Sequence, residues 1–179
     1  MPLIIMLAGP PASGKSTTSR ALAATFPRSI HINVDHLRDM VVSGAVHPST
    51  AWGDALVEQL RLARKIATEM AKTYHAAGFT VVIDDFLDPY SRLSEYAELF
   101  DMAELRRFVL FPEQLKAHAQ NLNRSGPGAL QQYLDEGIRI AYEVLNREVP
   151  HLVQEGWVVL DTTHNSLEET VARLRALLC

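Results

Sequence analysis

An eight-residue segment near the start of the chain constrains the fold more than any other feature. Residues 9–16 read GPPASGKS and fit the pattern G-x-x-x-x-G-K-[S/T] at every fixed position. An apolar run, residues 3–8, leads into the segment, and an amphipathic stretch that ends near Phe26 follows it. A glycine-rich turn between a strand and a helix lets successive backbone N–H groups point at one anion. The sequence therefore predicts a phosphate-binding loop in an α/β domain.

The predicted loop also gives roles to its side chains. Lys15 can reach the β- and γ-phosphates of a nucleotide, and the Ser16 hydroxyl can ligate Mg²⁺. The alternative is a glycine-rich turn that fits the pattern by chance, and the flanking strand and helix argue against it. We expect ATP to contact the loop and its first helical residues, namely Gly9, Pro10, Pro11, Ala12, Ser13, Gly14, Lys15, Ser16 and Thr17.

Short apolar runs alternate with longer amphipathic stretches along the rest of the chain. Five of these runs predict buried strands, at residues 3–8, 30–34, 79–83, 107–111 and 157–160. Between them, an apolar face at helical spacing predicts a long helix that Gly78 ends, and Ser166 with Glu169 predicts the capping box of a last helix. This alternation is typical of βαβ units with a parallel sheet. We expect one α/β domain that spans residues 1–179.

Charge and composition limit the partners. Seventeen basic against 21 acidic residues give a net charge of −4, which argues against binding of nucleic acid along a basic surface. The one cysteine, Cys179, cannot form an intrachain disulfide, which indicates a reducing compartment. Apolar runs are too short for a membrane span or a secretion signal. We therefore expect a cytoplasmic protein with a small-molecule substrate, no nucleic acid and no membrane partner; the oligomeric state is not predicted.

Acidic residues follow two of the predicted strands. Asp84 and Asp85 come directly after the third run, an arrangement typical of a Walker B element, and Asp35 follows the second run. We expect Asp84 to ligate Mg²⁺ and Asp85 to face the acceptor; the alternative is that they only begin a loop or cap a helix. Asp35 is either the general base for an acceptor hydroxyl or the N-cap of the next helix. Because parallel strands open on one crevice, Asp35, Asp84 and the phosphate loop should converge.

Two loosely patterned segments predict loops around an acceptor. Residues 41–55 form the predicted substrate loop, in which His47 and Trp52 are candidates for acceptor binding; exposure of His47 and core packing of Trp52 are the alternatives. Residues 120–130 form the predicted lid, where Arg124 either clamps the transferring phosphoryl group or lies in solvent. Four further basic residues could also reach a substrate, but their pattern favours solvated helix faces: Arg38, Arg61, Arg64 and Lys65.

Four segments together resemble the chloramphenicol phosphotransferase family of P-loop kinases. They read ASGKS at residues 12–16, VDHLRDM at 34–40, VIDDFL at 82–87 and DTTH at 161–164. The resemblance implies a P-loop NTPase fold of the nucleotide-kinase type, with three layers and about five parallel strands in the order 2-3-1-4-5. It also implies phosphorylation of an acceptor hydroxyl with ATP and Mg²⁺, and Asp35 as the general base. The chain departs from the family pattern between residues 41 and 78, which leaves antibiotic-, nucleoside- and sugar-like acceptors open.

The sequence favours an ATP-dependent phosphotransferase that acts on a hydroxyl of a small molecule. One alternative is a polynucleotide-end kinase or a toxin-type nucleotide-sugar kinase, which shares the same core. The net charge and the lack of a basic stripe with aromatic residues argue against the nucleic-acid version. The other alternative is an ATP-binding protein without activity, and the carboxylate of Asp35, which such a protein does not need, argues against it.

Overall fold

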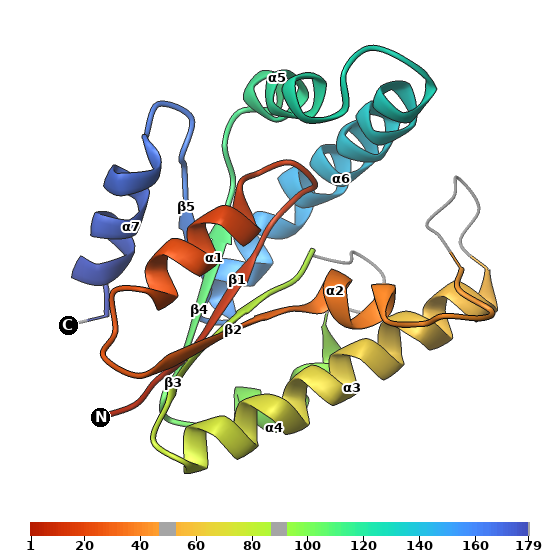
Figure 1. Cartoon of the computed structure of the whole chain (residues 1–179). Helices are drawn as coiled ribbons and strands as arrows, with labels where there is room; N and C mark the ends of the chain where they lie inside the picture. Colours follow the sequence, from red (N-terminus) through yellow and green to blue (C-terminus); the bar gives the residue numbers. More distant parts are fainter. Residues whose placement is uncertain (47–52, 87–92, 179) are drawn as a thin grey trace.

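The computed structural model describes residues 1–46, 53–86 and 93–178, and its centre is a parallel sheet (Figure 1). The sheet has five strands in the order β2-β3-β1-β4-β5, which confirms the predicted order 2-3-1-4-5. Each predicted strand is present, with its ends shifted by at most two residues. The strands are β1 (Ile4–Ala8), β2 (Ser29–Asn33), β3 (Thr80–Asp84), β4 (Leu105–Leu110) and β5 (Val158–Leu160).

Helices cover both faces of the sheet and form the expected three layers (Figure 1). On one face lie α1 (Lys15–Ala23) and α7 (Leu167–Ala176). On the other face lie α3 (Asp54–Ala76), the 3-10 turn η1 (Ser94–Tyr96), α4 (Ala97–Phe100) and α6 (Ala129–Gln154). The short α2 (Val34–Asp39) follows β2, and α5 (Gln114–Ser125) follows β4.

The core consists of two apolar layers, one on each face of the sheet, because successive residues of a strand point to opposite faces. Ile4 and Met6 of β1 pack toward α3 and α6, whereas Ile5 and Leu7 pack toward α1 and α7. All four side chains are fully buried, as expected for the central strand of a parallel sheet with helices on both faces. This arrangement leaves the carboxyl ends of the strands as the edge where loops gather polar groups.

Local signals in the sequence set the ends of two helices. After α3, Gly78 adopts a φ of +85°, a conformation that disfavours a side chain. At the start of α7, Ser166 and Glu169 form the predicted capping box. In the part of the chain that the structure describes, no helix has the length and apolar character needed to cross a membrane.

Candidate active site

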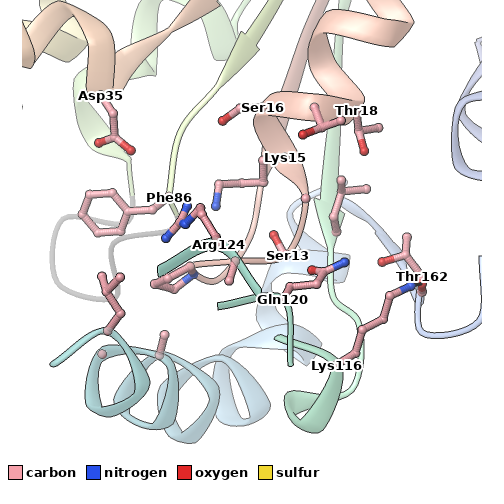
Figure 2. A pocket seen from close by; sticks show the side chains of 18 of the residues that line it. Ser13, Lys15, Ser16, Thr18, Asp35, Phe86, Lys116, Gln120, Arg124 and Thr162 are labelled. Carbon is pink, nitrogen blue, oxygen red and sulfur yellow. Dashed lines mark hydrogen bonds between the residues drawn. The ribbon is translucent and has the colours of Figure 1, made fainter. Parts of the chain in front are cut away.

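A cleft of about 1070 Å³ opens at the carboxyl ends of the strands (Figure 2). Residues 11–18 line it after β1, Asp35 after β2, Phe86 after β3 and Thr162 after β5. Figure 2 shows Asp35 and Phe86 at one end, Lys15 near the middle, and Thr162 at the other end. The structure therefore brings the predicted phosphate loop and Asp35 into one cleft, as the parallel topology requires.

The phosphate loop owes its shape to backbone conformations that few residues adopt. Gly9 has a φ of +152°, and a Cβ there would lie 2.4 Å from the carbonyl oxygen of Leu110. Gly14 has a φ of +84° and forms the N-cap of α1, while Ala12 has a φ of +57°, which is uncommon for a residue with a side chain. The chain therefore curls around the point to which the first N–H groups of α1 are directed, a ready site for a phosphate.

Lys15 supplies a partly buried amine at the centre of the cleft. Its Nζ donates a hydrogen bond of 2.8 Å to the carbonyl oxygen of Pro10, within the same loop. Burial lowers the pKa of Lys15, and the carboxylates of Asp84 and Asp35 oppose this effect. A phosphate chain in the loop would add negative charge and favour the protonated amine.

Ser16 and Asp84 form a pair of oxygen groups beside the loop. The Ser16 hydroxyl donates to Asp84 Oδ1 at 2.8 Å, and the Asp84 side chain is buried. Asn33 Nδ2 and the ring of His31 contact the same carboxylate. A hydroxyl and a carboxylate are hard oxygen ligands of the kind that Mg²⁺ takes next to nucleotide phosphates. The residues present therefore fit the magnesium ion that the motif predicts.

Asp35 does not cap α2. The N-cap is Asn33, whose Oδ1 accepts a hydrogen bond of 2.9 Å from the His36 backbone N–H. The helix begins one residue before Asp35, so the cap interpretation of this carboxylate is wrong. Its side chain is 60% exposed, lines the cleft, and lies 3.6 Å from Nη2 of Arg38. Asp35 therefore presents an accessible carboxylate in the cleft, as the general-base interpretation requires.

Asp85 lies away from the position we expected for it. Its Oδ2 accepts hydrogen bonds from Arg64 Nε at 2.7 Å and from the Tyr96 hydroxyl at 3.0 Å, and it is not among the described residues that line the cleft. Burial raises the pKa of Asp85, and the Arg64 guanidinium opposes this rise. The expectation that Asp85 faces the acceptor is therefore wrong in this structure.

The solvated position expected for Arg64 is also wrong, because its side chain is fully buried beneath α3. It bonds to Asp85, contacts Glu95 at 3.4 Å, and its guanidinium lies 5.3 Å from the centre of the Phe86 ring. The sequence contains a signal for this burial. Arg64 follows Leu60 by four residues and precedes Ala67 by three, so it falls inside the apolar face of the predicted helix.

Arg124 lies on a helix instead of a loop. It occupies the last turn of α5, which continues to Ser125 because the first chain-breaking residue is Gly126, with a φ of +69°. The side chain is on the wall of the cleft, and its charge contributes to lowering the pKa of Lys15, after the larger effect of burial. The helix therefore directs Arg124 toward the phosphate loop from the opposite side.

Sequence reasoning missed several side chains at the two ends of the cleft. At the end with Asp35, Leu56 and Leu60 of α3 and Tyr133 of α6 line the wall; at the other end, Lys116 and Gln120 of α5 do so. Burial raises the pKa of Tyr133, and the charge of Arg38, which lines the same cleft, opposes this rise. A helical pattern in residues 129–154 is the signal that would have located Tyr133. The candidates His47 and Trp52 lie outside the described residues.

Comparison with known proteins bears on the family and on the fold. The profile of the AAA domain family matches residues 4–125, more than half of the chain. No curated protein sequence gives a significant match. The specific resemblance to the chloramphenicol phosphotransferase family stays a prediction.

Three solved structures with low sequence identity share the fold. A shikimate kinase from Acinetobacter baumannii, in complex with shikimate, has a TM-score of 0.70 and 14% identity, covering 99% of this chain and 93% of its own. A sugar kinase from Janibacter gives 0.68 and 14%, with 99% and 95% covered. A tunicamycin resistance protein from Deinococcus radiodurans gives 0.67 and 15%, with 99% and 96% covered. These likenesses establish a P-loop kinase fold.

Proposed function

We propose a function for this chain, which belongs to the AAA domain family, from the side chains that its cleft brings together. We infer that it is a kinase that uses ATP and Mg²⁺ to phosphorylate a hydroxyl of a small molecule. The observation that carries this inference is that Asp35 and the phosphate loop line the same cleft, with the Ser16–Asp84 pair beside the loop. A carboxylate, a phosphate cradle and a pair of oxygen ligands are the parts that phosphoryl transfer to an alcohol needs.

Each of these side chains has a role in the proposed reaction. The loop and Lys15 hold the phosphate chain, and Arg124 faces it from α5, so that two cations balance its negative charge. Ser16 and Asp84 would hold Mg²⁺, which supplies further neutralisation of phosphate charge when bound. Asp35 orients the acceptor hydroxyl and accepts its proton as the oxygen attacks the γ-phosphorus.

The wall beside Asp35 indicates what kind of acceptor enters. Leu56 and Leu60 are buried in the wall, and Phe86 and Tyr133 add two aromatic rings. Such a wall favours an acceptor that has an apolar or ring-shaped body next to its hydroxyl, because apolar contact excludes water from the reacting group. Antibiotic- and nucleoside-like alcohols fit this description better than an open polyol. The shikimate kinase and the sugar kinase among the similar structures also support a small hydroxyl compound.

The test is single-turnover transfer by Asp35→Asn with an acceptor found in a panel of such alcohols. We expect transfer to fall by roughly 10²–10⁴, the range for loss of a positioned general base, with ATP affinity nearly unchanged. Asp54→Asn, which removes an exposed carboxylate at the start of α3 that is not among the described residues lining the cleft, is the matched control and should keep the parental rate. ATP turnover that ignores every acceptor and also ignores Asp35→Asn would contradict the proposal and favour an ATP-binding protein without transferase activity.

A further inference from the structure

We propose that Asn33 is a positioning residue that couples the Ser16–Asp84 pair to the helix that carries Asp35. The inference rests on the proposed function, because it assigns to Asn33 the alignment of the general base with the phosphate site. Asn33 lies between Asp35 and the Ser16–Asp84 pair, and it is not among the described residues that line the cleft.

Both ends of the Asn33 amide are engaged. The oxygen, Oδ1, accepts the 2.9 Å hydrogen bond from the His36 N–H and so caps α2. The nitrogen, Nδ2, donates to Ser16 Oγ at 3.0 Å and to Asp84 Oδ1 at 3.0 Å. One planar group therefore joins the first turn of α2 to the two residues that fit the magnesium ion.

The sheet fixes where this bridge forms. Asn33 and Asp84 are partners across the parallel ladder of β2 and β3, and each is the last residue of its strand. The main chain thus sets the distance between the amide and the carboxylate, while the cap sets the start of α2. Asp35 comes two residues after Asn33, so a rotation of α2 about this junction would move its carboxylate relative to the phosphate loop.

The chemistry requires an amide at this position. Aspartate would still accept the His36 N–H, but it has no donor and would place a second negative charge against Asp84. Serine would also cap the helix, but it has a single polar atom, so the oxygen that serves the cap cannot also occupy the place of Nδ2 beside Ser16 and Asp84. Asparagine alone among the good N-caps offers an acceptor and two donors on one rigid group.

The predicted effect appears in transfer to the acceptor. A misplacement of about 1 Å between reacting groups can cost roughly 10²-fold in rate. Hydrolysis of ATP by water does not need the alignment of Asp35 with a bound alcohol. Loss of the bridge should therefore slow transfer to the acceptor far more than it slows hydrolysis without acceptor.

The variant that separates the two halves of the amide is Asn33→Ser, which keeps a capping oxygen and removes the Nδ2 group that donates to Ser16 and Asp84. We expect single-turnover transfer to fall by about 10–10² while the thermal midpoint of the nucleotide-free protein stays close to the parental value. Hydrogen exchange of α2 in the nucleotide-free protein should rise in Asn33→Ser as well, because one anchor of the helix is gone. Asn33→Ala, which also loses the cap, should lower the thermal midpoint further.

A double variant decides whether Asn33 acts through Asp35. In an Asp35→Asn background, Asn33→Ser should cost no further transfer, because there is then no base to misalign. Independent, multiplying losses would overturn the inference, and so would parental transfer or unchanged exchange of α2 in Asn33→Ser alone. If Asp35→Asn itself transfers at the parental rate, the proposed base is wrong and the coupling falls with it. Loss in Asp35→Asn without loss in Asn33→Ser overturns the coupling only.

Discussion

Ser16 Oγ and Asp84 Oδ1 lie 2.8 Å apart, although 68 positions separate the two residues in the chain. Ser16 belongs to the first turn of α1, which follows β1, and Asp84 ends β3, the strand beside it. The contact therefore results from pairing of two neighbouring parallel strands whose carboxyl ends meet at one edge. It brings together the hydroxyl and the carboxylate that would hold Mg²⁺ in the proposed reaction.

Asp84→Asn should lower the apparent affinity of the protein for magnesium. The amide keeps the size of the side chain and removes one negative charge, so more Mg²⁺ is needed for half-maximal transfer and transfer slows with every acceptor. The measurement is transfer rate against Mg²⁺ concentration at saturating ATP. Asp35→Asn serves as the comparison, because it should lose rate without a shift in the Mg²⁺ curve. Identical Mg²⁺ curves for Asp84→Asn and the parent would remove Asp84 from the metal site.

Lys15→Ala should abolish transfer and leave the fold intact. The amine acts on phosphate charge, and its own contact is a single hydrogen bond to the Pro10 carbonyl oxygen in the loop. Thermal unfolding and transfer measured on the same preparation check the two halves of this expectation. Parental transfer by the variant would refute the role of Lys15, and an unfolded variant would show that the lysine is structural.

The lowered pKa of Lys15 predicts opposite effects of pH on stability and on nucleotide binding. Burial disfavours the charged amine in the folded protein, so raising the pH through the lowered pKa should stabilise the nucleotide-free protein. The same loss of charge should weaken ATP binding, starting below the ordinary lysine pKa of about 10.4. Calorimetric titration with ATP across this pH range is the measurement. Lys15→Ala should lack the step, and a step at the ordinary lysine value would contradict the prediction.

The layered fold could be predicted from the sequence because its signals are local. Apolar runs of four to six residues mark the strands, and GPPASGKS marks the first strand-to-helix turn. The predicted strand ends differ little from the observed ones, because each buried apolar run and the hydrogen-bonded strand that it forms differ only at their terminal residues. The strand order came from a resemblance to a family and not from the runs, since pairing between distant strands leaves no local pattern.

The candidate site was predictable only in part. Asp35 and Asp84 follow strands, so the topology was enough to bring both to the phosphate loop. Asp85 was misplaced because the pattern does not show which of two successive carboxylates turns to the opposite face of the strand. Its partner Arg64 is separated from it by 21 positions, and such a pairing depends on how α3 packs against the sheet.

Removing the buried guanidinium of Arg64 should destabilise the fold strongly. Arg64→Met leaves the buried Asp85 carboxylate without its guanidinium, which typically costs about 3–5 kcal/mol of unfolding free energy. Arg61→Met, one turn earlier on α3 with a side chain 68% exposed, is the matched control and should change stability by less than about 1 kcal/mol. Denaturant unfolding measures both variants. A second change, Asp85→Asn, should recover part of the loss in Arg64→Met, and a further loss instead would show that the charge pair is not the cause.

Gly9→Ala should impair both folding and nucleotide binding for a steric reason. The new Cβ would lie 2.4 Å from the Leu110 carbonyl oxygen, which belongs to the backbone of β4 and cannot move aside as a flexible side chain can. We expect a loss of roughly 1–3 kcal/mol in unfolding free energy, together with weaker ATP binding as the loop shifts. Gly137→Ala is the matched control: nothing lies within 4 Å of its added Cβ and it sits inside α6, so it should raise stability by about 0.5–1 kcal/mol. Denaturant unfolding compares the stability of the two variants, and ATP titration compares Gly9→Ala with the parent. Equal stability of Gly9→Ala and Gly137→Ala would mean that the approach of the loop to β4 is looser than 2.4 Å implies.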